Sequence, residues 1–278
     1  MKKYLNHTFS ENDKELVSII DELPLWSAPF GLSLLDTIKL GKGFKVLDLG
    51  SGTGFPLIEI AQRLGESSKV FGIDPWEEAN ERANIKKKKY NLKNTEVIKG
   101  TAENLPFENS YFDLIVSNNG INNVNDLTQT LKECRRTAKT GAQFVFTMNL
   151  EDTMKEFYNP LKEELGKRNL HESIKKMAEQ IYNKRRPLNE ITKLLDENDF
   201  QVNEIKHDIF YLRFADAESM LNHSLIKYWF LNGWKSIIDE DLQEEIFDKV
   251  EARMDEIIKT DKQIKLSVPF VTVDCERK

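Results

Sequence analysis

A glycine-rich loop led by an acid is the stretch of this sequence whose residue types bear most directly on chemistry. Residues 46–60 are VLDLGSGTGFPLIEI, so an apolar run passes through Gly50-Ser-Gly-Thr-Gly54 into apolar residues at helical spacing. Glycines can take positive φ and let a ligand approach the backbone, and Pro56 suits a first helical position. Free amides and the positive end of a helix dipole would face that ligand, which predicts a nucleotide-type site.

The spacing of the glycines distinguishes between kinds of nucleotide. The dinucleotide fingerprint is G-x-G-x-x-G, whereas this loop has three alternating glycines after an acid, and a Walker phosphate loop is absent. The stretch D-L-G-S-G-T-G resembles the first motif of class I S-adenosylmethionine (SAM)-dependent methyltransferases, in particular the small-molecule, type 11 (UbiE-like) group. The resemblance covers roughly residues 44–150 in its motifs and the whole chain in its layout. It implies that the methionine part of SAM is surrounded by Asp48, Gly50, Ser51, Gly52, Thr53 and Gly54.

A second acid lies at the tip of the next predicted strand, Lys69–Ile73. Asp74 comes 24 residues after Gly50, where one carboxylate can accept both hydroxyls of a ribose. A helix N-cap is the alternative role, but the glycine loop independently requires a ribose acceptor, so we favour cofactor binding. By resemblance, Pro75 and Trp76 lie against the adenine, although Trp76 could instead pack under its helix.

The loop after the predicted third strand, Thr95–Lys99, carries a further signal. Thr101, Ala102 and Glu103 resemble the loop with which this family contacts adenine. Many relatives have Asp where this chain has Glu103.

The predicted fourth strand, Leu114–Ser117, is placed next to the first and ends in a run rich in asparagine. Ligands of open α/β sheets bind outside the carboxyl ends of strands, so Asn118 and Asn119 could hold the cofactor's amino-acid end or the substrate. Asparagine is equally suited to a turn that needs no ligand. The run is not N-P-P-Y, which disfavours methylation of nucleic-acid bases or protein glutamine.

The elements that must position these loops alternate between strand and helix. A fifth strand is predicted at Gln143–Met148, a last covering helix at Pro187–Asn198, a sixth strand at Val202–Tyr211 and a final strand at Ile264–Asp274. The resemblance implies an α/β, Rossmann-like class I methyltransferase fold: a seven-stranded, mostly parallel sheet with helices on both faces plus helical cap insertions. An antiparallel final strand would separate this fold from that of dehydrogenases.

Helical segments beyond the minimal fold suggest a domain organisation. We predict an N-terminal helical lid (1–43, with helices Asn12–Leu23 and Gly31–Leu40), a SAM-binding core (44–150), a helical cap (151–186) and the rest of the core (187–278, with a helical insertion at about 215–262). A helix pair packed on its own apolar seam is an equal interpretation of 151–186. The candidate substrate residues are Tyr4, Trp26, Tyr158 and Tyr182, although packing is the favoured role of Trp26.

The charge, the cysteine content and the lack of long apolar runs limit the kinds of binding partner and location that we expect. A formal charge of −6 argues against a broad nucleic-acid surface, and Lys86–Lys89 are interpreted as a solvated helix end that complements the dipole. Cys134 and Cys275 form no metal-ligand or disulfide pattern and are expected to be buried thiols, so no metal is predicted. No apolar signal segment follows the N-terminal lysines and no run approaches a membrane span, which favours a cytoplasmic protein. A homodimer is left open.

Methyl transfer from SAM asks little of the protein, because the sulfonium already activates the methyl group. The protein mainly has to hold a nucleophile in line with the methyl carbon and exclude water. His7, His207, His223 and Glu103 are candidate bases, but none has a diagnostic spacing, so the catalytic residue is unknown. The sequence thus predicts a SAM-dependent methyltransferase acting on a small, partly apolar metabolite. A non-catalytic SAM-binding regulator or partner subunit is the alternative, and an NAD-linked oxidoreductase is a distant third.

Overall fold

The structure of the 278-residue chain is a computed structural model that describes Leu5, Lys14, Ser18 and residues 25–278. The side chains of residues 257–261 are not described. The predicted helix Asn12–Leu23, the candidate substrate residue Tyr4 and the candidate base His7 lie outside the described residues.

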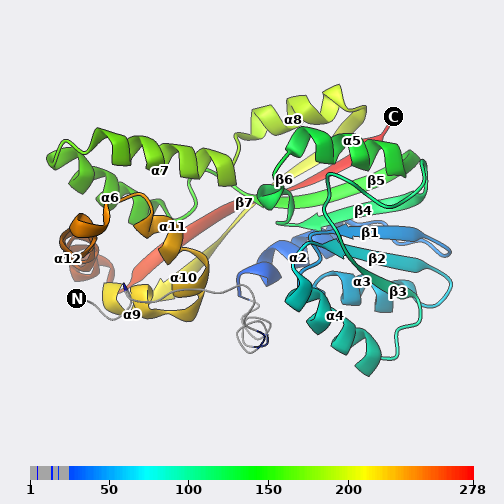
Figure 1. Cartoon of the computed structure of the whole chain (residues 1–278), viewed down its shortest axis with the longest axis horizontal. Helices are drawn as coiled ribbons and strands as arrows, with labels where there is room; N and C mark the ends of the chain where they lie inside the picture. Colours follow the sequence, from blue (N-terminus) through cyan, green and yellow to red (C-terminus); the bar gives the residue numbers. More distant parts are fainter. Residues whose placement is uncertain (1–4, 6–13, 15–17, 19–24) are drawn as a thin grey trace. The chain divides into compact units, whose positions relative to one another are not determined.

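The described residues form a sheet of seven strands in the order β3-β2-β1-β4-β5-β7-β6 (Figure 1). The strands are β1 (Lys45–Leu49), β2 (Lys69–Asp74), β3 (Thr95–Lys99), β4 (Phe112–Asn118), β5 (Ala138–Asn149), β6 (Phe200–Phe214) and β7 (Ile264–Arg277). Neighbouring strands from β3 to β5 pair in parallel, while β7 pairs antiparallel with β5. The predicted class I methyltransferase fold, with its antiparallel final strand, is confirmed.

The chain divides into two compact units. Among the described residues, the sheet unit comprises Lys14, Ser18 and residues 25–149, 187–208 and 270–278, and the helical unit comprises Leu5 and residues 150–186 and 209–269. β6 and β7 each contribute residues to both units. The functional division predicted from the sequence, with a lid, a core and a cap, stays a prediction.

In the sheet unit, apolar helix faces cover the parallel strands. The helices are α2 (Ser27–Thr37), α3 (Leu57–Leu64), α4 (Glu77–Lys89), α5 (Leu127–Thr137) and α8 (Leu188–Glu197), with a short 3-10 turn η2 (Ile121–Asn123). One core joins α2 and α3 to the sheet through Leu34, Leu57 and Ile60, which pack on Val46 and Val116. Each such buried side chain stabilises the fold by about 1.5–3 kcal/mol. α5 and α8 lie together, away from α3 and α4 (Figure 1).

α2 begins earlier than the sequence pattern predicts. The expected helix was Gly31–Leu40, but the helix starts at Ser27 and ends at Thr37. Pro29 falls in the first turn, where its missing N–H would have had no intrahelical partner, so this proline does not break the helix.

The helical unit contains α6 (Lys155–Lys167), α7 (His171–Lys184), α9 (Ala217–Asn222), α10 (Ser224–Trp229), α11 (Leu231–Lys235), η3 (Glu240–Leu242) and α12 (Gln243–Asp261). The predicted helices of 151–186 and 215–262 therefore fold into one body. Its core contains Phe157 stacked on Trp234 with ring centroids 3.7 Å apart. Glu156, in the first turn of α6, accepts hydrogen bonds from the backbone N and Oγ of Ser267 in β7, at 2.9 and 2.7 Å. These contacts attach α6 to the strand.

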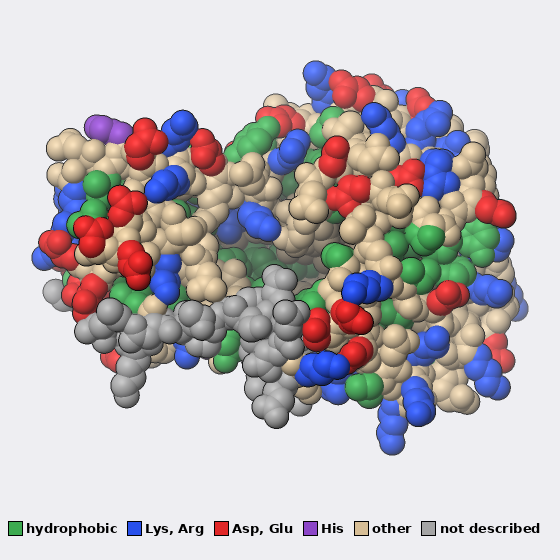
Figure 2. All heavy atoms as spheres, in the orientation of Figure 1, with side chains coloured by type: hydrophobic (Ala, Val, Ile, Leu, Met, Phe, Trp, Pro, Cys, Tyr) green, Lys and Arg blue, Asp and Glu red, His purple; other side chains and the backbone are tan. Residues whose placement is uncertain are grey.

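Acidic and basic side chains are intermixed over the face shown in Figure 2. Both cysteines are fully buried free thiols, as predicted, and burial raises their pKa. In the described part of the chain, no helix combines the length and apolarity needed to cross a membrane.

Candidate functional site

The glycine loop joins β1 to α3 and is held against the neighbouring strand. The predicted positive φ angles are confirmed at Gly50 (72°), Gly52 (50°) and Gly54 (103°). The amide of Gly50 donates to the carbonyl of Ile73 in β2 at 2.9 Å. A Cβ on Gly50 would lie only 3.2 Å from Cα of Gly120, so glycine is required here for both conformation and space.

Asp74 ties this loop to the end of β2. Its Oδ2 accepts from the amide of Gly52 and its Oδ1 from the amide of Trp76, both at 2.9 Å. Burial raises the pKa of Asp74, and the two amide hydrogen bonds oppose that rise. Trp76, not Asp74, is the N-cap residue of α4, so a simple capping role for Asp74 is not what the structure shows. Each carboxylate oxygen keeps acceptor capacity for a ligand hydroxyl.

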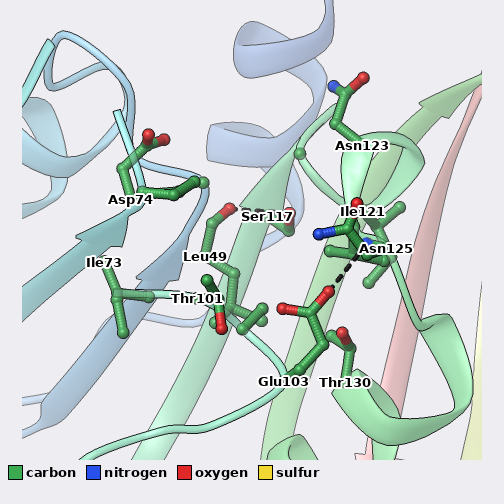
Figure 3. A pocket seen from close by; sticks show the side chains of 15 residues that line it. Leu49, Ile73, Asp74, Thr101, Glu103, Ser117, Ile121, Asn123, Asn125 and Thr130 are labelled. Carbon is green, nitrogen blue, oxygen red and sulfur yellow. Dashed lines mark hydrogen bonds between the residues drawn. The ribbon is translucent and has the colours of Figure 1, made fainter. Parts of the chain in front are cut away.

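A cavity of about 240 Å³ opens at the carboxyl ends of β1, β2 and β4 (Figure 3). Side chains from the end of β2, from the loop after β3 and from the segment after β4 converge on it, as the strand-end rule for parallel sheets predicts. Its lining consists of Leu49, Gly50, Ile73, Asp74, Pro75, Thr101, Ala102, Glu103, Ser117, Gly120, Ile121, Asn123, Val124, Asn125 and Thr130.

Glu103 organises one wall of the cavity. Its Oε1 accepts from the amides of Asn125 at 2.8 Å and Asp126 at 3.2 Å (Figure 3). Burial would raise the pKa of Glu103, but its several hydrogen bonds outweigh burial and lower it. Asp126 in turn caps α5 by accepting from the amide of Gln129. The carboxylate thus fixes the segment between β4 and α5 in place.

The two asparagines predicted at the tip of β4 bind the protein rather than line the cavity. Asn119 adopts a left-handed conformation (φ 56°), and its Oδ1 accepts from Asn122 Nδ2 at 3.1 Å and from the Asn149 amide at 3.2 Å. Asn118 Oδ1 accepts from the hydroxyl of Thr147 at 3.1 Å. This geometry shows the turn-forming role for Asn119, and ligand contact by either asparagine stays a prediction.

Asp48 lies beneath the glycine loop with no exposed surface. Neither of its carboxylate oxygens has a hydrogen-bond partner of normal geometry among the described residues. Burial, and then the negative charge of Asp74, raise the pKa of Asp48 well above its ordinary value, while the nearby Leu57 amide opposes the rise. Ser51 Oγ is likewise buried without a partner. Unsatisfied polar atoms at this point indicate a site built for a polar ligand group.

The structure thus brings together six of the predicted cofactor residues in the cavity lining: Gly50, Asp74, Pro75, Thr101, Ala102 and Glu103. The other predicted residues are outside the lining: Asp48, Ser51, Gly52, Thr53, Gly54, Trp76, Asn118 and Asn119. Sequence reasoning did not name the remaining lining residues, which are Leu49, Ile73, Ser117, Gly120, Ile121, Asn123, Val124, Asn125 and Thr130. The strand-end rule could have extended the site through 120–125, but no signal singled out Thr130 in α5. The ligand contacts themselves stay predictions.

The candidate substrate residues are dispersed. Trp26 packs edge-to-face on Phe30 with ring centroids 5.3 Å apart, consistent with a packing role. In the helical unit, Tyr158 is buried, with its hydroxyl bonded to two side chains, while Tyr182 is 41% exposed. Their contact with a substrate stays a prediction.

The described candidate bases do not form a catalytic arrangement. His207 is exposed on β6. His223 Nδ1 accepts from the Leu225 amide at the start of α10, and burial lowers its pKa. No base is assigned.

Comparison with known proteins identifies the family. A sequence model of the family described as "Methyltransferase domain" matches residues 40–199, more than half of the chain. The chain belongs to this family. The match includes every strand and loop that forms the cavity.

Curated relatives of this methyltransferase chain include the demethylmenaquinone methyltransferase of Lactococcus lactis, which is 38% identical over 103 residues. That alignment covers 37% of this chain and 41% of the relative. The chain therefore spans less than half the length of the curated relatives it matches first.

Solved structures agree on the fold. A SAM-dependent methyltransferase from Aquifex aeolicus superposes with a TM-score of 0.52 at 22% identity, covering 69% of this chain and 91% of that chain. The geranyl diphosphate C-methyltransferase of Streptomyces coelicolor, in complex with Mg²⁺, geranyl diphosphate and S-adenosylhomocysteine, superposes at 0.55 with 16% identity, covering 100% and 88%. At these identities the likeness shows the fold alone.

Proposed function

We propose that this chain is a SAM-dependent methyltransferase that transfers a methyl group in line to a small, partly apolar metabolite. The observation that carries the proposal is the cavity at the strand ends, where the glycine loop, the acid that ends β2 and the loop after β3 meet. A dinucleotide site would need different glycine spacing, which disfavours a nicotinamide enzyme.

The residues present fit SAM. Asp74 has acceptor capacity for the ribose hydroxyls, and the loop Thr101–Glu103 provides a wall for the adenine. The amino-acid end of the cofactor carries a positive ammonium. The buried Asp48 carboxyl under the glycine loop, whose oxygens have no partner of normal geometry among the described residues, would supply the matching negative charge when that ammonium binds. SAM would supply an activated methyl group, and the chain would bind, orient and exclude water.

Two of the similar proteins support the proposed substrate class. The relative from Lactococcus lactis acts, by its name, on demethylmenaquinone, and the Streptomyces coelicolor enzyme acts on geranyl diphosphate. Both support a small acceptor with an apolar part. We also propose that residues 1–43 form a lid and 151–186 a cap, that the protein is cytoplasmic, and that it can assemble as a homodimer.

Two measurements test the proposal. Isothermal titration of the full chain with S-adenosylhomocysteine should show micromolar binding, and reduced nicotinamide should not bind. A folded protein that binds no S-adenosylhomocysteine would overturn the cofactor assignment. Consumption of SAM in the presence of fractionated metabolite pools then separates an enzyme from the alternative, a SAM-binding regulator without turnover.

A further inference from the structure

Arg185 is a buried guanidinium for which the described residues supply no acceptor. It is the C-cap residue of α7, and only 4% of the residue's surface is exposed. Its Nε and Nη1 are enclosed and have no hydrogen-bond partner, and no described carboxylate forms an ion pair with it. Its backbone amide is satisfied by the carbonyl of Ile181 at 2.8 Å. The backbone amide of Arg185 is therefore satisfied, and only Nε and Nη1 of its side chain lack hydrogen-bond acceptors among the described residues.

A guanidinium cannot relieve this situation by losing its proton, because it stays charged at every physiological pH. Burial of an uncompensated charge opposes folding, and natural proteins pair such groups or neutralise them. A buried arginine with free donors therefore indicates a place where an anion is received.

The described surroundings of Arg185 stabilise a cation but offer no acceptor to its Nε or Nη1. The guanidinium lies over the ring of Tyr158, 5.4 Å from its centroid. The Tyr158 hydroxyl is engaged elsewhere, since it accepts from Trp234 Nε1 and bonds to Gln180 Oε1, both at 3.1 Å. The negative end of the α7 dipole adds a favourable field. The group is thus held in place by aromatic and dipole contacts.

Two other arginines, Arg136 and Arg277, donate hydrogen bonds to acceptors of the protein. Arg136 forms an ion pair with Glu133 and donates to the carbonyls of Leu105 and Phe107. Arg277 leaves Nε without a partner, but its Nη1 donates to the Ala138 carbonyl. Arg185 differs from both because neither its Nε nor its Nη1 has a hydrogen-bond partner among the described residues.

We propose that Arg185 binds the carboxylate or phosphate group of a small-molecule ligand received in the helical unit beside Tyr158. The guanidinium fork matches either group with two parallel hydrogen bonds. Lys184 and Arg186 flank it in the sequence and add positive potential. The proposal rests on Arg185 and its neighbours alone, so it holds independently of the methyl-transfer function.

The test uses the full chain and the variant Arg185→Met, which keeps the length of the side chain and removes its charge. The matched control is Arg186→Met, the adjacent arginine, which is less buried and lies over the ring of Tyr182. Thermal unfolding is followed in chloride and in acetate, phosphate or pyrophosphate at equal ionic strength. Chloride is the reference for general salt effects.

In chloride, we expect Arg185→Met to unfold at a temperature equal to or above that of the wild type, because an unpaired buried charge is gone. With the binding anion, the wild type and Arg186→Met should gain several degrees, while Arg185→Met gains no more than the general salt effect. The anion that produces the gain distinguishes a carboxylate site from a phosphate site.

Three outcomes would overturn the proposal: no gain for the wild type with any of the anions, an equal gain for Arg185→Met, or destabilisation of Arg185→Met in chloride without any anion effect. If Arg185→Met does not fold, Arg185→Lys retains the charge but not the fork. Titration calorimetry with phosphate, or with acetate if that anion gave the gain, should then show affinity about tenfold weaker than the wild type. Unchanged affinity would contradict the proposal.

Discussion

Two buried charges of opposite sign, one in each unit, have no partner among the described residues. Asp48 lies under the glycine loop of the sheet unit, and Arg185 ends α7 in the helical unit. Both are enclosed, but they respond differently to that burial. Asp48 can take up a proton, and burial raises its pKa, whereas guanidinium groups do not lose their proton in proteins. The carboxyl site can therefore remain vacant at a lower energetic cost than the guanidinium site.

Asp48 and Arg185 also differ in the groups that surround them. Asp48 shares its surroundings with a second acid, Asp74, whose charge raises the pKa of Asp48 further. Arg185 has an aromatic face and a helix C-terminus, both of which favour the charged form. The sheet unit thus holds acids that a positively charged ligand would ionise, and the helical unit holds a cation ready for an anion.

The largest effect is expected for Asp74→Ala. It removes the proposed ribose acceptor and releases the amides of Gly52 and Trp76, so S-adenosylhomocysteine should bind roughly 10- to 150-fold more weakly by calorimetry. Asp113→Ala is the control, because Asp113 accepts from the Lys45 amide near the amino end of β4. Equal affinity for Asp74→Ala and the wild type would remove Asp74 from the cofactor site.

Asp48→Asn should change how stability depends on pH. The folded pKa of Asp48 is raised above its unfolded value, so both states are protonated in strong acid. As pH rises above the unfolded value, near 4, only the unfolded chain releases this proton, and stability falls until the folded pKa is passed. Asn cannot ionise, so the variant should lack this loss.

We therefore compare the free energy of unfolding of Asp48→Asn with that of the wild type, without cofactor, at each pH. The difference should favour the variant by roughly 1–3 kcal/mol more at neutral pH than in acid. Urea unfolding at several pH values measures the difference. If the free energies of unfolding of the two proteins changed with pH in parallel, the Asp48 carboxyl would have an ordinary pKa in the folded protein. The difference in response to burial between Asp48 and Arg185 would then not hold.

The smallest effect is expected for Tyr158→Phe. The variant loses the hydroxyl that bonds Trp234 and Gln180 and should lower the free energy of unfolding by about 1 kcal/mol. The ring remains, so stabilisation by the anion that Arg185 binds should persist. Tyr182→Phe, at an exposed position, should stay within about 0.5 kcal/mol of the wild type. Loss of the anion effect in Tyr158→Phe would instead place the hydroxyl in the ligand site.

The parts of the site that the sequence predicted are those formed by local backbone chemistry. The alternating glycines Gly50, Gly52 and Gly54 specified the loop, and Asp74 was predicted at the end of β2, because turns and strand ends depend on nearby residues. The strand Thr95–Lys99 was predicted with its observed bounds. Thr130 was missed because it enters the cavity lining from α5, at a position that no local pattern marks.

The sequence by itself determined the fold class, the glycine loop and the family, because these depend on periodicity and on residues close together in the chain. Only the tertiary structure decided which polar groups keep a partner. Arg185 follows Lys184 at a helix end and resembles a solvated cation in sequence, yet packing buries it without an acceptor. Asp48 likewise loses its solvent to packing. Whether a buried polar group has a hydrogen-bond partner depends on residues brought together from distant segments. A local sequence pattern therefore does not show it.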